Sequence, residues 1–301
     1  MPGTKPKPSR NGSLINIKSL TTITCKPIIT TLLCIIVTMN TVSAKQNLID
    51  SEKINAYVIN LARSKTRLNY VMPKVKALGI HTQRIEAVDG QKLNMQTIAK
   101  VLAPDYSSYM GKYPDTGSIG CALSHIKTWQ ACLASDAEFA LILEDDIGFD
   151  PKTLTTIITA LIHKKDQWDI AGLQLAHRGW PVTKAQLTNQ HRMVIYLSKV
   201  TNSGAYLLNR KAAARLLKNA LPIHMALDHY FFLSWKHDIN LVGVEPRVVQ
   251  QSHGSSEIND GVRSHIFFPH QSAYHFSIGH EIYKIQIYLY WLYYSLLALL
   301  R

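Results

Sequence analysis

Three consecutive carboxylates, Glu144, Asp145 and Asp146, are the side chains of this sequence best suited to chemistry. They follow residues 139–143, a run of five apolar side chains that is typical of a buried strand in a parallel sheet. Adjacent like charges repel one another and are costly to desolvate, so the group makes sense if a divalent cation lies among them. Mg²⁺ and Mn²⁺ bind through one or two carboxylates together with substrate phosphates.

The alternative interpretation of these acids is a solvated turn that caps the next helix. Asp150 and Pro151 already form the pattern of an N-cap followed by a first helical residue, so the earlier three acids need another explanation. Ligands of open α/β sheets bind beyond the carboxyl ends of strands, which is where these acids stand. The pattern therefore predicts a metal–phosphate site at this strand end, with the solvated turn as its competitor.

The elements that would position this site alternate between strands and helices. Residues 54–61 predict a first strand, and residues 64–78 predict a helix that Pro73 kinks. Residues 83–88 predict a second strand that ends at an Asp-Gly turn. Strand–helix–strand is the unit from which a parallel sheet flanked by helices is built.

The rest of the chain continues this pattern after a long connection, which is predicted at residues 91–117. Ser118 predicts the start of a helix that runs to about Ala134, and His125 beside its apolar face is interpreted as a hydrogen-bonded core residue. Residues 174–193 are polar and predict irregular structure. Further strands are predicted at residues 169–173, 194–197, 204–208 and 241–249, and Asn209 predicts the cap of another helix.

The net charge of +13 indicates an anionic partner. Nucleic acid, anionic lipid and a sugar-nucleotide diphosphate all fit that sign. Lysine and arginine are dispersed along the chain and no nucleic-acid motif occurs, which argues against nucleic acid. The four cysteines form no CxxC pair, so neither a zinc site nor a disulfide framework is predicted.

Both ends of the chain carry segments that are set apart from the predicted domain. Residues 1–44 have the pattern of a targeting leader, with a basic start, a short apolar run and a passable cleavage site at residues 42–44. The alternative is an over-extended reading frame whose true start is Met39. Residues 281–301 are apolar and aromatic, and they predict a helix that lies in an anionic membrane surface. An apolar helix packed on the domain or in a dimer interface is the alternative for this tail.

Four blocks in the middle of the chain follow one another over about residues 54–255. The first block is residues 57–61 (YVINL) with Arg63 and Arg67, and the second is residues 87–90 (AVDG). The third is residues 117–129 (GSIGCALSHIKTW) followed by residues 140–146 (ALILEDD). The fourth is residues 204–208 (GAYLL) continuing to Asp228 and His229. Together they resemble glycosyltransferase family 25, whose bacterial members build the outer sugars of lipopolysaccharide and lipooligosaccharide. One departure is Ala62, where the family usually has an acid before the arginine.

This resemblance implies an α/β fold of the GT-A-like, nucleotide-sugar-binding kind, with a mostly parallel central sheet flanked by helices, in residues 52–260. It implies a hexosyltransferase that moves a sugar, galactose from UDP-galactose in typical bacterial members, onto a hydroxyl of a lipopolysaccharide or lipooligosaccharide glycan. Transfer would invert the configuration of the sugar and use Mn²⁺ or Mg²⁺. Such a chain is expected in the bacterial cytoplasm, peripheral on the inner membrane, unless the leader exports it.

The resemblance and the chemistry together suggest roles for individual residues. The metal is assigned to Asp145, Asp146 and His253, of which the histidine is otherwise an ordinary loop residue. An inverting displacement needs a base on the acceptor side, and Asp228 fills that role unless it caps a helix at residues 229–235. Six residues are assigned to the donor, and the two arginines among them would otherwise form a solvated helix face: Asn60, Arg63, Arg67, Asp89, Glu144 and Asp145.

Two other classes of function compete with a glycosyltransferase. Another nucleotide-dependent transferase, such as a nucleotidyltransferase, would use the acidic cluster but would need a glycine-rich phosphate loop, which the sequence lacks. A catalytically silent sugar-binding protein would be favoured by loss of the acidic cluster, which is intact.

Overall fold

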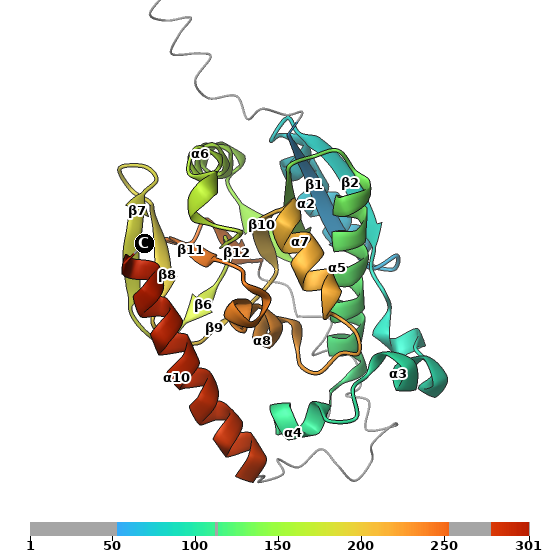
Figure 1. The fold of residues 1–301 in the computed structure, drawn as a ribbon. Helices are drawn as coiled ribbons and strands as arrows, with labels where there is room; N and C mark the ends of the chain where they lie inside the picture. Colours follow the sequence, from blue (N-terminus) through green and yellow to red (C-terminus); the bar gives the residue numbers. More distant parts are fainter. Residues whose placement is uncertain (1–52, 112–113, 253–277, 301) are drawn as a thin grey trace, which may run out of the picture. The chain divides into compact units, whose positions relative to one another are not determined.

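The computed structural model describes residues 53–111, 114–252 and 278–300 (Figure 1). The chain divides into two units, Met1–Gln46 and Asn47–Arg301, and every described residue belongs to the second. The predicted leader and His253 lie outside the described residues.

An eight-stranded sheet is the main element of the second unit. Two of its strands, β10 and β8, run against the other six. The α/β class with a mostly parallel sheet, expected from the sequence, is therefore confirmed. In spatial order the strands are β2 (His81–Glu86), β1 (Ile54–Asn60), β3 (Phe139–Glu144), β10 (Ala205–Asn209), β5 (Ile170–Gly172), β11 (Leu241–Glu245), β8 (Arg192–Tyr196) and β7 (Pro181–Gln186).

Helices cover both faces of this sheet (Figure 1). Successive side chains of a strand point to opposite faces, so each strand feeds two cores. Val58 and Leu143 join the core under α2 (Lys65–Lys76) and α6 (Pro151–Ile162). Tyr57 and Ile142 join the core under α5 (Thr116–Ala134) and α7 (Arg210–Lys218). Burial on both faces explains why residues 139–143 are apolar without interruption.

Capping side chains fix where the helices begin. Asp150 accepts a hydrogen bond from the Thr153 amide at the start of α6, and Asn209 accepts one from the Ala212 amide at the start of α7, as predicted. The prediction that Ser118 caps α5 is wrong. Asp115 is the cap, because its carboxylate accepts hydrogen bonds from the Ser118 amide at 2.7 Å and from the Ser118 hydroxyl at 2.9 Å.

Two segments are more ordered than their sequences suggest. The segment predicted as irregular, residues 174–193, contains β6 (Ala176–His177) and β7, which forms a hairpin with β8. The connection predicted at residues 91–117 contains α3 (Met95–Val101) and α4 (Tyr106–Met110) after the short helix η1 (Gly90–Lys92).

The single strand predicted at residues 241–249 is two strands, since Pro246 has no amide proton to donate to a ladder. The second of them, β12 (Val249–Gln251), pairs with β4 (Ile147–Phe149), which follows the acidic turn directly. The remaining short elements are η2 (Lys165–Gln167), β9 (Val200–Thr201), α8 (Leu227–Phe232) and η3 (Ser234–His237).

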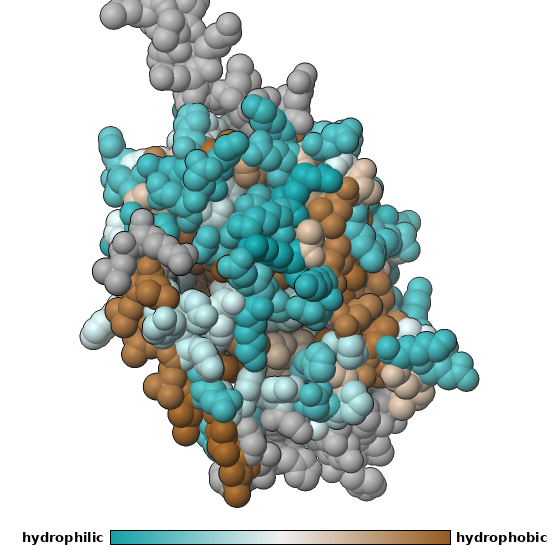
Figure 2. Space-filling model, in the orientation of Figure 1, coloured by the Kyte–Doolittle hydropathy of each residue, from teal (hydrophilic) through white to brown (hydrophobic). Residues whose placement is uncertain are grey.

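The C-terminal helix α10 (Ile278–Leu300) packs on α4 and β8. Tyr283 and Ile287 are buried in a cluster with Met225 and Phe232. None of the described helices combines the length and the hydropathy that a transmembrane span requires. Figure 2 shows an apolar stripe over α10, and its exposed large side chains are Ile278, Ile282, Ile285, Tyr288, Leu289, Tyr290, Leu292, Tyr293, Tyr294 and Leu296.

Candidate functional site

The sheet topology brings three separate stretches of chain to one edge. β3 and β5 point the same way and end there, and the antiparallel strand β10 between them begins there. The residues after β3, those after β5 and those before β10 therefore meet. They open onto a cleft of ≈ 420 Å³. The cleft is lined by Ser118, Cys121, Glu144, Asp146, Gln174, Asn202, Ser203, Gly204, Ala226, Leu227, Asp228 and Gln251.

Asp146 is the acid of the turn that faces this cleft, and only 8% of it is exposed. The Gln251 amide nitrogen donates to its carboxylate at 3.2 Å, and its backbone oxygen accepts from the Ser252 amide at 2.7 Å. Burial and the charge of Glu144 raise the pKa of Asp146 above its ordinary value, against the opposing effect of the Gln251 hydrogen bond. A nearby cation would relieve both causes, so this position is suited to a metal.

Asp145 is equally buried but turns toward β1 and α2. Its carboxylate accepts from the Asn60 amide nitrogen at 2.6 Å and lies 3.5 Å from the Arg67 guanidinium. Asn60 is itself held, because Arg84 donates to its side-chain oxygen at 2.9 Å. The two adjacent aspartates are thus separated in role by their partners: one opens onto the cleft and the other ties the turn to the sheet.

Glu144 is oriented by a buried chain of hydrogen bonds. Trp129 Nε1 donates to the Tyr206 oxygen at 2.9 Å, and that oxygen lies 2.8 Å from His125 Nδ1. His125 Nε2 lies 3.2 Å from Glu144 Oε1. A proton on Nδ1 of a neutral imidazole would leave the Nε2 lone pair facing the carboxylate, so the network places the proton on Nε2. His125 is a hydrogen-bonded core residue, as predicted, and it also holds one end of the acidic cluster.

Cys121 places a sulfur atom, a soft metal ligand, beside this chain of hydrogen bonds. Ligand atoms of Cys121, His125 and Glu144 all lie within 4.8 Å of one another, a spacing that could hold a metal ion. Burial, and then the charge of Glu144, raise the pKa of the Cys121 thiol well above its usual range. A protonated thiol is a poor ligand, and hard cations prefer oxygen. The carboxylates of Glu144 and Asp146 therefore fit a divalent cation better than the trio containing sulfur.

Asp228 lines the same cleft from the start of α8. Its Oδ1 accepts a hydrogen bond from the His229 amide at 2.8 Å. The alternative that Asp228 caps this helix is wrong, because the cap position belongs to Ala226 and Asp228 lies inside the first turn. The cleft thus unites Glu144 and Asp146 with Asp228, which is 82 residues further along the chain than Asp146.

The other predicted residues that the structure describes lie outside the lining of the cleft. Arg63 forms an ion pair with Asp89, which also caps η1 by accepting from the Gln91 amide at 3.1 Å. Arg67 is half-buried and paired with Asp145, so it is not part of a fully solvated helix face. His253 lies outside the described residues.

The sequence did not reveal four uncharged residues of the cleft, which are Gln174, Asn202, Ser203 and Gly204. Gln174 is 4% exposed and lies two residues after the end of β5, much as Glu144 ends β3, so a polar residue after a buried strand was a usable signal. Asn202 adopts a positive φ of 69°, a conformation that asparagine tolerates better than most residues. A side chain at Gly204 would collide with Gln174 Oε1, so this glycine keeps the floor of the cleft open.

Comparisons with known proteins agree with one family. The family model described as "Glycosyltransferase family 25 (LPS biosynthesis protein)" matches residues 53–231. A "Glycosyltransferase 25 family member" of Aedes aegypti is 38% identical over 99 residues, which is 32% of this chain and 16% of that protein. "Procollagen galactosyltransferase 2" of Homo sapiens is 29% identical over 121 residues, which is 38% of this chain and 19% of that protein.

An inactive relative is also similar. "Probable inactive glycosyltransferase 25 family member 3" of Rattus norvegicus is 24% identical over 226 residues, or 65% of this chain and 38% of that protein. The chain thus spans less than half the length of these curated relatives.

Solved structures show distant likeness. A glycosyltransferase involved in glycosylation of the major capsid of PBCV-1 has 11% identity and a TM-score of 0.36, and the match covers 67% of this chain and 95% of that chain. S. aureus TarS 1-349 has 12% identity and a TM-score of 0.39, with 66% of this chain and 60% of that chain covered.

Proposed function

Because this chain belongs to glycosyltransferase family 25, we propose that it moves a sugar from a nucleotide-sugar donor to a hydroxyl group of an acceptor. The observation that carries the proposal is the cleft in which Glu144 and Asp146 meet Asp228. Such a reaction needs a stabilised diphosphate leaving group and a base for the acceptor hydroxyl. Glu144 and Asp146 can hold the cation that stabilises the diphosphate, and Asp228 can act as the base.

The donor side of the proposal is the acidic turn. Glu144 and Asp146 would hold Mn²⁺ or Mg²⁺, whose bound charge polarises and neutralises diphosphate oxygens. Asn60 and Arg67 support this assignment indirectly, since they fix Asp145 and with it the geometry of the turn. A metal contact from Asp145 itself and from His253, and donor contacts from Arg63 and Asp89, remain parts of the proposal.

The acceptor side of the proposal is Asp228. Its carboxylate would take the proton of the attacking hydroxyl while the sugar–phosphate bond breaks on the opposite face of the sugar, which inverts the anomeric centre. Asp228 lines the same cleft as Glu144 and Asp146, which supports its assignment to this site.

The finer assignments are galactose from UDP-galactose and a lipopolysaccharide or lipooligosaccharide acceptor. The family description names lipopolysaccharide biosynthesis, and a human relative is named a galactosyltransferase. A glycolipid acceptor also suits the exposed apolar side of α10 and the net charge of +13, which together favour an anionic membrane surface. The proposed location is the cytoplasmic face of a bacterial inner membrane.

Release of nucleoside diphosphate from a panel of nucleotide sugars tests this function. The full chain is assayed in detergent with Mn²⁺ and lipooligosaccharide, and we expect turnover with one donor that chelation abolishes. Asp228→Asn should lower turnover while donor affinity stays within about twofold, because the base acts only on the acceptor proton. Absence of turnover with every donor, together with normal donor binding, would favour a catalytically silent protein like the inactive relatives.

A further inference from the structure

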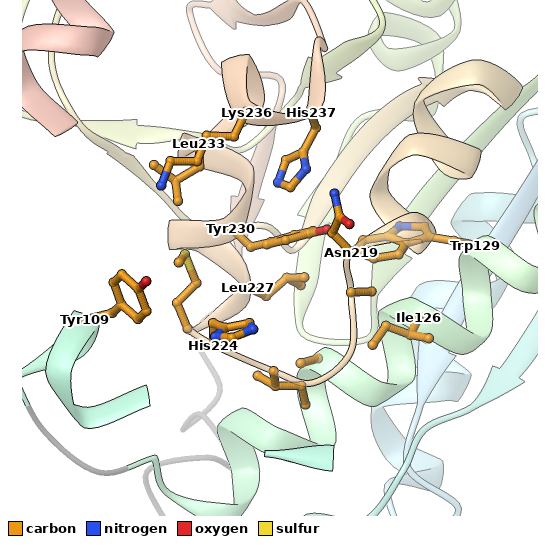
Figure 3. A pocket seen from close by; sticks show the side chains of 14 residues that line it. Tyr109, Ile126, Trp129, Asn219, His224, Leu227, Tyr230, Leu233, Lys236 and His237 are labelled. Carbon is orange, nitrogen blue, oxygen red and sulfur yellow. The ribbon is translucent and has the colours of Figure 1, made fainter. Parts of the chain in front are cut away.

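A second cavity, of ≈ 370 Å³, lies beside the acidic cleft between α5, α8 and η3 (Figure 3). Ligand-binding cavities typically have volumes of about 300–1,000 Å³ and are mostly apolar with a few polar groups. This cavity has that character, since Ile126, Trp129, Leu227 and Tyr230 form much of its wall. Of the described residues, Leu227 alone lines both this cavity and the acidic cleft. It is therefore a separate site in contact with the first.

The polar groups of this cavity come from η3. Figure 3 shows the ring of His237 above the ring of Tyr230, with the Lys236 side chain extending away from His237 toward Leu233. Both ring nitrogens of His237 are buried and have no hydrogen-bond partner among the described residues. Burial, and then the charge of Lys236, lower the pKa of His237 to about 4, and burial lowers the pKa of Lys236. Buried polar groups without partners are costly, so the ring nitrogens of His237 are suited to a ligand that supplies an acceptor. Lys236, an exposed residue of the lining, adds a positive charge beside them.

The charge of the cavity has one sign. None of the described residues that line it is aspartate or glutamate. The third basic residue of the lining, His224, is already paired with Asp105 at 2.7 Å. The ring face of Tyr283, 5.7 Å from the Lys236 ammonium, gives only a weak electrostatic partner. An anionic head would pair with the ammonium of Lys236 and accept a hydrogen bond from His237.

We propose that this cavity binds a single-chain amphipathic anion, with a carboxylate or phosphate head against Lys236 and His237 and an apolar body among Trp129, Leu227 and Tyr230. The proposal does not depend on the transferase reaction, because no group of the acidic turn or Asp228 lines the cavity. It goes beyond the proposed function by giving the chain a second ligand of a stated chemical class.

Equilibrium binding of dansyl-labelled undecanoate to the full chain tests the proposal. We expect saturable binding that laurate and dodecyl phosphate displace at least about tenfold better than dodecanol, since only the anions pair with Lys236. A fatty-acid source is indicated if laurate is the better competitor, and a phospholipid source if dodecyl phosphate is. Equal displacement by dodecanol would overturn the anionic head.

Variants locate the bound probe. Lys236→Met should weaken binding about tenfold, and His237→Phe should also weaken it. Lys218→Met, an equal change of charge at an exposed lysine outside the cavity, should not. Asn219→Trp should block the probe without adding volume to the core, because Asn219 is an exposed residue of the rim. Unchanged binding in Asn219→Trp, with loss of binding in Leu289→Lys on the exposed side of α10, would place the probe on that helix and refute the proposal.

Discussion

Asp145 and Asp146 show that neighbouring residues of one type can have separate tasks. Asp146 opens onto the cleft, whereas Asp145 is bound by Asn60 and Arg67. The sequence pointed to both through their position after an apolar strand. It could not separate them, because the partners of Asp145 come from the first strand and the helix after it.

The metal assignment leads to a prediction for Asp146→Asn. An amide is a poorer ligand for a hard cation than a carboxylate is, so turnover should fall sharply. Changing a residue that only supports a metal ligand costs roughly 10–100-fold, and the loss in Asp146→Asn should exceed that. Folding should be retained, since the pKa of this carboxyl is already raised by burial and its charge contributes no stability that the amide would forfeit. Turnover is measured against Mn²⁺ concentration, with Asp136→Asn on the exposed surface as the control. Normal Mn²⁺ dependence in Asp146→Asn would refute the assignment.

The hydrogen-bond chain behind Glu144 leads to a second prediction at the residue scale. Tyr206→Phe removes the hydroxyl that bonds His125 Nδ1 and holds the imidazole in place, so Glu144 loses its orientation. We expect turnover or metal affinity to fall about tenfold. Tyr57→Phe is a matched control, because its hydroxyl is also bonded to α5, at 3.3 Å from the Ala131 oxygen, but leads to no residue of the cleft. Both variants should lose about 1 kcal/mol of stability. An equal effect of the two on turnover would mean that Tyr206 is only structural.

At the scale of elements, Asp169 ties together the strands that frame the cleft. It precedes β5 and accepts hydrogen bonds from the Asn240 amide at 2.9 Å and the Asn209 side chain at 3.1 Å, with Lys211 at 3.1 Å. Burial acts to raise its pKa, but these hydrogen bonds and the lysine outweigh burial and lower it. The carboxylate form is therefore favoured by folding.

This arrangement predicts a pH-dependent loss of stability in Asp169→Asn. A carboxyl whose pKa is lower in the folded state than in the unfolded state stabilises the fold at pH values above its unfolded-state pKa, which is about 3.9. This contribution disappears as the pH falls through the folded-state pKa. The variant should lose about 1–3 kcal/mol at pH 7, and the difference from wild type should shrink below about pH 4. Urea denaturation over that range measures it, with Asp166→Asn in η2 as the exposed control. A difference that persists unchanged in acid would mean that shape, not charge, is responsible.

The order of strands and helices was predictable because burial on both faces leaves continuous apolar runs, as in β1 and β3. The reversed direction of β10 was not predictable, since an apolar run carries no information about direction. That reversal is what brings Asn202 and Ser203 to the acids, so the neutral half of the cleft stayed hidden. The hairpin strand β7 was missed because Pro181–Gln186 lacks the alternation of apolar and polar residues that marks a half-buried strand.

At the scale of the whole chain, α10 combines two surfaces that a simple truncation would confuse. Tyr283 and Ile287 belong to a buried cluster, so removal of the helix would expose part of the core. Substitution of exposed positions only is the cleaner experiment. Ile285→Ser, Leu289→Ser and Leu292→Ser together remove apolar area on the solvent side.

The triple variant should keep its melting temperature and lose flotation with anionic liposomes, since interfacial binding scales with buried apolar area. Leu221→Ser, at an exposed leucine outside α10, is the control and should float as the wild type does. Flotation of the triple variant at the wild-type level would assign the membrane contact to another part of the chain.

Trp129 belongs to two structures at once. Its ring lines the cavity beside η3, and its indole N–H donates to the Tyr206 oxygen at the head of the chain that ends on Glu144. A ligand that moves this ring in the cavity changes the free energy of the hydrogen-bond chain from Trp129 to Glu144. Thermodynamic linkage makes the effect reciprocal. If the ligand changes the affinity of the acidic turn for a cation by some factor, the cation must change the affinity of the cavity for the ligand by the same factor. One indole would then act as the coupling element of a heterotropic pair.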